Sequence, residues 1–173
     1  MRSFFRPIAG SATVLLVAGC AAMVSQQRGR EVMASPQSIM LTARSVFDSY
    51  HIPTGGQISD HAIQSNSFDP APEWTPEQAN ERVECTAPAK PKKIDGGPTV
   101  WLTIRANAAE VRSSQRSPLA RATMGAEIMP VSNVYITSSG RRSDGGHCMI
   151  TDSFAEALLS AITSTAPSNR STN

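Results

Sequence analysis

Cys148 and its neighbours are the side chains whose types could support covalent catalysis. Cys148 directly follows His147, and Asp144 and Asp152 lie close by in the sequence. A thiol beside a base is the pair that a cysteine nucleophile requires. Adjacent residues of an extended chain point to opposite faces, however, so His147 is badly placed to activate Cys148 directly. We therefore predict no catalytic residue in this segment.

The sequence gives equally little support for a metal site or a phosphate-binding site. The three histidines, His51, His61 and His147, do not have the H-E-x-x-H spacing of a zinc site. Two cysteines are too few to make a four-ligand zinc site by themselves. The chain also has no G-x-S-x-G motif and no phosphate-binding G-x-x-x-x-G-K-[ST] loop. We predict no metal, no cofactor and a protein that is not an enzyme.

The N-terminus has the pattern of an export signal. Arg2 and Arg6 precede an apolar run over residues 8–17. About ten apolar residues match the hydrophobic region of a signal peptide, whereas a membrane-spanning helix needs roughly twenty. The sequence therefore predicts a cleaved signal rather than a permanent transmembrane helix.

The end of this signal, Val17-Ala18-Gly19-Cys20, resembles the lipobox of bacterial lipoproteins. The resemblance implies cleavage of residues 1–19 and attachment of membrane lipid to Cys20. Val17 stands where leucine is usual, and Ala21 replaces the aspartate that retains such proteins at the inner membrane. The resemblance thus implies an anchor on the periplasmic face of the outer membrane. Two or more acyl chains hold a protein stably. The alternative is an ordinary signal and a freely secreted domain.

The charge balance gives no indication of nucleic-acid binding. The full chain has 16 Lys+Arg against 14 Asp+Glu. Arg2 and Arg6 leave with the signal, so the mature chain has 14 of each. A nucleic-acid-binding domain concentrates positive charge on one face, but the basic groups here lie in proline- and glycine-rich stretches typical of solvated loops. These groups are Lys90, Lys92, Lys93 and Arg141-Arg142.

The lipoprotein resemblance also implies different roles for the three cysteines. With Cys20 assigned to lipid, Cys85 and Cys148 remain in an oxidising compartment, where thiols are expected to pair. We predict a disulfide between Cys85 and Cys148. The alternative is two separately buried thiols.

Secondary-structure signals divide the mature chain into a tether, a domain and a tail. Residues 20–35 are small and polar, which is typical of a flexible tether. Ser35-Pro36 can begin a helix, and the apolar residues after it follow helical spacing to Tyr50. The domain is expected over residues 36–164, with a disordered tail over 165–173. The helical stripe comprises Ile39, Met40, Ala43, Val46, Phe47 and Tyr50.

The middle of the chain has the sequence patterns of β-strands and of one short helix. Ile58 and residues 62–68 predict two short antiparallel strands, and Thr75-Pro76-Glu77-Gln78 can cap a short helix. Val100, Leu102 and Ile104 then alternate with polar residues, which indicates a strand with one buried face and Trp101 on the other.

Two further strands, a loop and a helix complete the expected domain. The strands are predicted over residues 120–129 and 131–137, separated by Pro130. A polar loop is expected over residues 140–146. Ser153 with Glu156 forms a capping-box pattern at the start of a last amphipathic helix.

The order of these elements predicts an α+β fold, with an antiparallel sheet of about five strands packed against an N-terminal and a C-terminal helix. In pattern, residues 36–164 resemble small envelope lipoprotein domains of helix-grip type. We expect a lipid-anchored, non-enzymatic outer-membrane lipoprotein that binds or supports another envelope component. The alternative is a lipid-anchored periplasmic hydrolase whose site is assembled from scattered residues.

Overall fold

The computed structural model describes residues 28–90, 93, 97, 99–111 and 130–166 of the 173-residue chain. The signal, Cys20, the strand predicted over residues 120–129 and the end of the tail lie outside these residues. Seven strands and four helices follow one another in the described part. They are β1 (Arg28–Val32), α1 (Pro36–Ser49), β2 (Thr54–Ser59), β3 (Ala62–Ser65), α2 (Pro70–Glu73), α3 (Pro76–Arg82), β4 (Val83–Thr86), β5 (Val100–Glu110), β6 (Ser132–Arg142), β7 (His147–Ile150) and α5 (Asp152–Thr165).

The strands form one antiparallel sheet in the order β2-β3-β5-β6-β7-β4. β5 and β6 are the long central pair, matched residue for residue from Val100↔Arg142 to Glu110↔Ser132. β1 pairs with the first half of β6, and β7 pairs with its end. The predicted α+β class with helices at both ends of the chain is confirmed, and the sheet has seven strands rather than about five.

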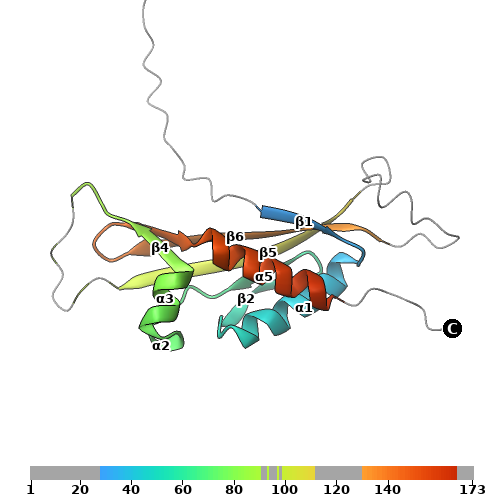
Figure 1. The fold of residues 1–173 in the computed structure, drawn as a ribbon, viewed down its shortest axis with the longest axis horizontal. Coiled ribbons are helices and arrows are strands. Elements are labelled where there is room, and N and C mark those ends of the chain that lie inside the picture. The colour runs from blue at the N-terminus through green and yellow to red at the C-terminus, as the bar shows by residue number, and fades with distance from the viewer. Residues whose placement is uncertain (1–27, 91–92, 94–96, 98, 112–129, 167–173) are drawn as a thin grey trace, which may run out of the picture.

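All four helices lie on one face of this sheet (Figure 1). α1 and α5 pack side by side across β5 and β6, and α2 and α3 lie at the end near β4. Every second residue of β5 from Leu102 to Ala108 is buried beneath them. The core residues of the sheet include Leu102, Ile104, Val134 and Ile136, and those of the two long helices include Ile39, Phe47, Leu158 and Ile162.

α1 begins and ends where the sequence predicts. The Ser35 hydroxyl accepts a hydrogen bond from the Ser38 backbone N–H at 3.3 Å, and Pro36 occupies the first turn. The predicted apolar stripe is buried from Ile39 to Phe47, and Tyr50 at its end is half-buried. His51 follows the helix with a positive φ of 56°, which turns the chain away from the helical path. The strand pair β2–β3 and the capping box of α3 at Thr75 and Gln78 also match the predictions.

Two segments expected to lack regular structure belong to the sheet. Arg28–Val32, inside the predicted tether, forms β1 by pairing with the first half of β6, and Arg30 also reaches the Glu156 carboxylate of α5. β6 continues to Arg142, through half of the predicted loop 140–146, because Gly140 and Arg141 pair with both β5 and β7. Both pairings depend on residues far away in sequence.

The last helix starts two residues earlier than predicted. Thr151, not Ser153, is the N-cap, and its hydroxyl oxygen accepts from the Phe154 N–H. The same hydroxyl donates to the Glu81 carbonyl at 2.8 Å, which fixes it in the capping position. α5 also includes Thr165, which was predicted to begin the tail.

Candidate functional site

A groove lies at the end of the domain where α2 and α3 cross above the sheet. Its volume is about 390 Å³. Two local capping motifs build its helical side. Asp69 caps α2 by accepting from the Ala71 N–H, and Thr75 caps α3. Pro70 and Pro76 fit the first turns of these helices because proline lacks the N–H that a first turn leaves unpaired.

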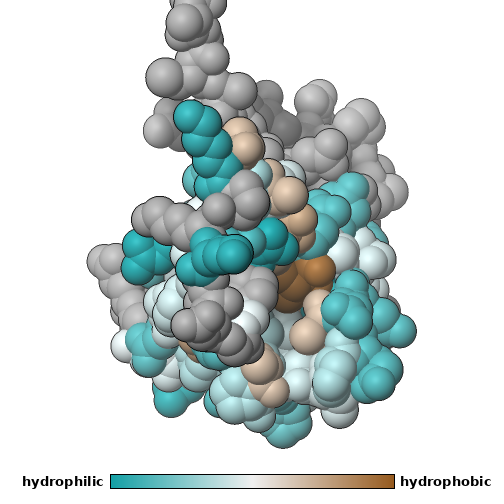
Figure 2. Space-filling view, turned by 90° about the vertical axis from the view of Figure 1, so that its left-hand side faces the viewer, coloured by the Kyte–Doolittle hydropathy of each residue, from teal (hydrophilic) through white to brown (hydrophobic). Residues whose placement is uncertain are grey.

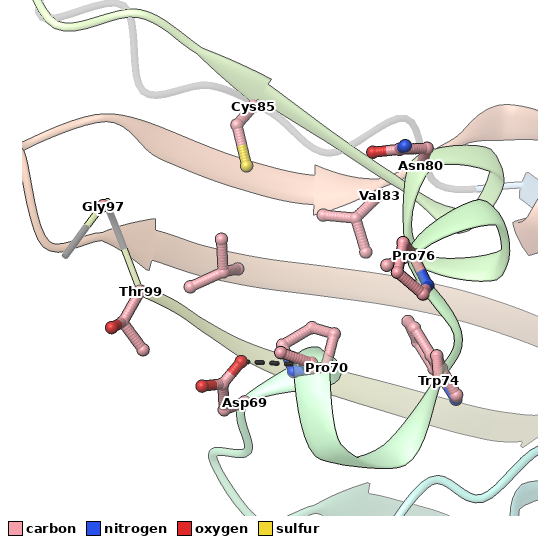
Figure 3. Close-up of a pocket in the computed structure, with 12 residues that line it drawn as sticks. Asp69, Pro70, Trp74, Pro76, Asn80, Val83, Cys85, Gly97 and Thr99 are labelled. Carbon is pink, nitrogen blue, oxygen red and sulfur yellow. Dashed lines mark hydrogen bonds between the residues drawn. The ribbon is translucent and has the colours of Figure 1, made fainter.

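The groove is lined mostly by apolar groups. Trp74, Pro76 and Val83 stand on one side, and Thr99 and Gly97 stand on the other (Figure 3). Viewed from this end, a small area of hydrophobic surface lies among hydrophilic side chains (Figure 2). The full described lining is Asp69, Pro70, Ala71, Trp74, Pro76, Ala79, Asn80, Val83, Cys85, Gly97, Thr99 and Val100.

Among the described residues of this lining, Asp69 is the one that can ionise. Its Oδ1 accepts the Ala71 backbone N–H at 3.0 Å, so one carboxylate oxygen already serves the cap of α2 (Figure 3). The other polar groups are the Asn80 amide and the Thr99 hydroxyl. A site of this kind gains binding energy from apolar contact and uses a few polar groups at its rim for orientation.

The disulfide predicted between Cys85 and Cys148 is confirmed, and it forms part of the groove. The two residues face each other on β4 and β7, with their Cα atoms 4.1 Å apart. Cys85 lines the groove, whereas Cys148 is buried. The bond therefore holds the edge strand β4, and with it the groove wall at Val83, to the rest of the sheet.

An aromatic cluster holds Trp74 in the same wall of the groove as Val83. The Trp74 ring meets the rings of Phe68 and Phe154 edge to face, each with centroids 5.5 Å apart. Its indole N–H donates to the Tyr50 carbonyl at 2.8 Å. The Arg82 guanidinium lies 5.0 Å from the Trp74 ring centroid and near the rings of Tyr50 and Phe154. Such contacts between a cation and ring faces are favourable, so Trp74 is held from several directions.

None of the residues considered for catalysis lines the groove, although Cys148 is bonded to Cys85, which does. His51 follows α1, His61 lies in the β2–β3 turn, and His147 is exposed on β7. Cys148 faces the helices while His147 faces away, which confirms that neighbours on this strand point to opposite faces. Asp144 is bound by Arg142 at 2.7 Å. Among the described residues, no three histidine, cysteine or acidic side chains come close enough to hold a metal ion.

Sequence reasoning missed the groove, although part of its signal was visible. Asp69-Pro70 and Thr75-Pro76 are two helix-starting patterns only six residues apart. Two short helices in succession require a sharp change of direction at Trp74, and a large aromatic residue at such a corner indicates an anchoring contact. The strands that complete the groove come from distant segments and gave no comparable signal.

Comparison of the chain with protein-family models, with curated proteins and with solved structures found no match in any of the three. Within the described ranges, no helix is long and apolar enough to cross a membrane.

Proposed function

We propose that this protein is a lipid-anchored lipoprotein of the outer membrane, exposed on its periplasmic face, whose domain binds another component of the cell envelope without catalysing a reaction. The anchor is membrane lipid attached to Cys20, the first residue after the proposed signal peptide 1–19. The binding site is the groove beside α2 and α3, and its occupant is an apolar segment of an envelope protein.

The observation that carries this proposal is the Cys85–Cys148 disulfide. Disulfides persist in oxidising compartments and are rare in the cytosol. The bond therefore agrees with the export signal and with the lipobox-like Val17-Ala18-Gly19-Cys20. It also leaves Cys20 as the free cysteine that acylation requires.

The groove supports a binding role through its chemistry. Its walls are held by the disulfide and by the aromatic cluster around Trp74, and a preformed site avoids the cost of ordering side chains on binding. Its described lining offers apolar contact and a single carboxylate, which suits an apolar segment better than a charged one.

A periplasmic hydrolase is the second candidate function. His147 is exposed on β7 and is the histidine nearest to the groove end of the sheet by strand position. Hydrolysis of an ester, amide or glycoside substrate by the purified protein, abolished in His147→Ala, would favour this candidate over the binding role.

Metabolic labelling tests the anchor. Cells expressing the wild-type chain are grown with a labelled fatty acid and compared with cells expressing Cys20→Ala. We expect label in the wild-type protein, none in the variant, and release of the variant from membranes by salt alone. An unlabelled wild-type protein, or a mature N-terminus other than Cys20, would refute the anchor.

Substitutions of two exposed alanines, one inside the groove and one outside it, test the groove as the binding site. Ala71 is exposed and lines the groove, while Ala157 is exposed on α5 outside it. A photo-crosslinker at position 71, but not at position 157, should yield one envelope protein. A synthetic peptide from the crosslinked segment should then bind the purified protein, about tenfold more weakly in Ala71→Arg and unchanged in Ala157→Arg. Equal affinity in both variants would exclude the groove as the site.

A further inference from the structure

The sheet face opposite the helices presents an ordered set of polar side chains. Because residues alternate between faces along each strand, the partners of buried Leu102 and Ile104 on β5 are Trp101, Thr103 and Arg105. No described element covers this side of the central strands (Figure 1). We call this side of the sheet the open face. Its described side chains used below are Gln64, Ser67, Trp101, Thr103, Arg105, Thr137, Ser139, Arg141 and His147.

Strand register places the side chains of the open face in rows across the sheet. Trp101 on β5 lies opposite Arg141 on β6, and Arg141 lies opposite His147 on β7. The next row along β5 and β6 is the hydroxyl pair Thr103 and Ser139.

A third row and a third hydroxyl extend this pattern. Gln64 on β3 lies opposite Arg105, which in turn lies opposite Thr137. Ser67 adds a hydroxyl beside Thr103, since its neighbour Phe68 bridges to β5. The open face is therefore a hydroxyl row between two rows that each contain an arginine.

A shallow depression of about 290 Å³ lies over the first two of these rows, the Trp101–Arg141 row and the hydroxyl row. Trp101 is 37% exposed there, one of the few large hydrophobic side chains so exposed in the described part of the chain. The Arg141 guanidinium lies 5.9 Å from the Trp101 ring centroid, near the outer limit for attraction to the ring. The described lining is Ser67, Trp101, Thr103, Ser139, Gly140 and Arg141.

The described charges nearest the depression are positive, with Arg141 in its lining and Arg105 in the adjacent row. Arg105 and Arg141 are both exposed, and neither forms an ion pair with a described residue. The acidic residues of this face, Glu31 and Glu84, lie on the outer strands β1 and β4. Among the described residues, an anionic ligand would therefore meet Arg141 in the depression and Arg105 one row away, and carboxylates only on the outer strands.

We propose that the open face is a second binding site, for a carboxylate-bearing glycan strand. A sugar ring would lie on Trp101, because the electron-rich face of an indole attracts the C–H groups of a pyranose. Its hydroxyls would exchange hydrogen bonds with Ser67, Thr103 and Ser139. Its carboxylates would accept paired N–H donors from Arg141 and Arg105, the geometry that guanidinium groups favour.

A single-stranded nucleic acid fits this face less well. Such ligands are held by several aromatic rings on which successive bases stack. The second aromatic residue of the open face, Tyr135, is half-buried, and its ring lies over Gly29 of β1, where a Cβ would come within 2.6 Å of it. Trp101 thus remains as a single stacking platform beside a row of hydroxyls.

Isothermal titration of the full-length processed protein in detergent tests this site. The probes are hexagalacturonate as the anionic glycan, cellohexaose as its neutral counterpart and a twelve-nucleotide oligothymidylate as the single-stranded nucleic acid. We expect hexagalacturonate to bind, and Trp101→Ala and Arg141→Gln each to weaken it about tenfold. Arg44→Gln, an exposed arginine on the helical side, is the matched control and should leave its affinity unchanged. Thermal unfolding of each variant verifies that it folds.

The outcomes separate this site from the groove. Loss of hexagalacturonate binding in Trp101→Ala and Arg141→Gln, with binding retained in Ala71→Arg, supports the open face. No binding of hexagalacturonate, equal binding of cellohexaose, or affinities that do not respond to Trp101→Ala would overturn it. Tighter binding of the oligothymidylate, weakened by the same variants, would replace the glycan by a nucleic acid.

Discussion

Cys85 and Cys148 are directly opposed partners of the antiparallel pair β4–β7, joined by a disulfide. β4 has β7 as its one strand partner in the described sheet, and that pairing covers four residues. α3 leads directly into β4. The covalent bond therefore determines whether the outer edge of the sheet and the groove wall remain in place.

Loss of the disulfide should destabilise the domain strongly. The bonded cysteines are 63 residues apart, and a closed loop of that length restricts the unfolded chain by about 4 kcal/mol in the chain-entropy model. Urea unfolding of Cys85→Ala/Cys148→Ala measures the loss. Reductant should lower the wild-type stability to a similar level and leave the double variant unchanged. An unaltered wild-type midpoint after complete reduction would contradict this prediction.

Removal of the Arg82 charge should loosen the aromatic cluster. Arg82 is half-buried and lies within 5.4 Å of three ring centroids. Arg82→Gln should reduce the free energy of unfolding by about 1–2 kcal/mol and shift the fluorescence of Trp74. Arg82→Lys should lose less because it keeps the charge. Arg44→Gln on α1 serves as the exposed control, and an equal loss in that variant would argue against a role for the rings.

The start of α5 can be tested by two neighbouring substitutions. Thr151→Ala removes the N-cap and the 2.8 Å hydrogen bond to Glu81, so it should cost about 1–2 kcal/mol. Ser153→Ala removes only a hydroxyl contact with Thr151 at 3.1 Å and should cost a few tenths of a kcal/mol. Chemical denaturation of both variants measures the two losses in the free energy of unfolding. A larger loss in Ser153→Ala would assign the cap to Ser153 after all.

The β6–β7 turn should respond to acid. Hydrogen bonding from Arg142, followed by that from the Gly146 N–H, lowers the pKa of Asp144. A carboxyl with a lowered folded-state pKa stabilises the fold above its unfolded value of about 3.9, and that contribution disappears as the pH falls through the lower folded value.

Asp144→Asn should therefore be less stable than the wild type near pH 7 and equal to it at about pH 2. Melting temperatures measured across this range give the difference directly. The opposite trend, with the two proteins diverging as the pH falls, would show that the Asp144 carboxylate does not stabilise the turn.

Local signals explain which parts of the fold could be predicted. Ser35-Pro36 and the stripe after it encode α1 within one stretch of sequence, and the period-two pattern around Leu102 encodes β5. The cysteine pairing followed from the assignment of Cys20 to lipid. Each of these predictions needs only nearby residues or a count.

The missed features depend on distant partners. Arg30 and its neighbours have no apolar alternation, and β1 is held by β6 and by Glu156. The sequence around Gly140 and Arg141 is typical of a loop. They belong to a strand because they pair with Leu102 and Trp101 of β5. The groove and the open face likewise bring together residues that are far apart in the sequence, so a single sequence read locally does not reveal them.

Because β1 begins at Arg28, the sheet itself limits how far the domain can stand from its anchor. Eight peptide units separate Cys20 from Arg28, and eight residues reach no more than about 29 Å whatever their conformation. With Cys20 in the bilayer as proposed, the start of β1 stays within about 29 Å of the anchor. The domain is thus held beside the membrane, and a partner must come to that surface to meet it.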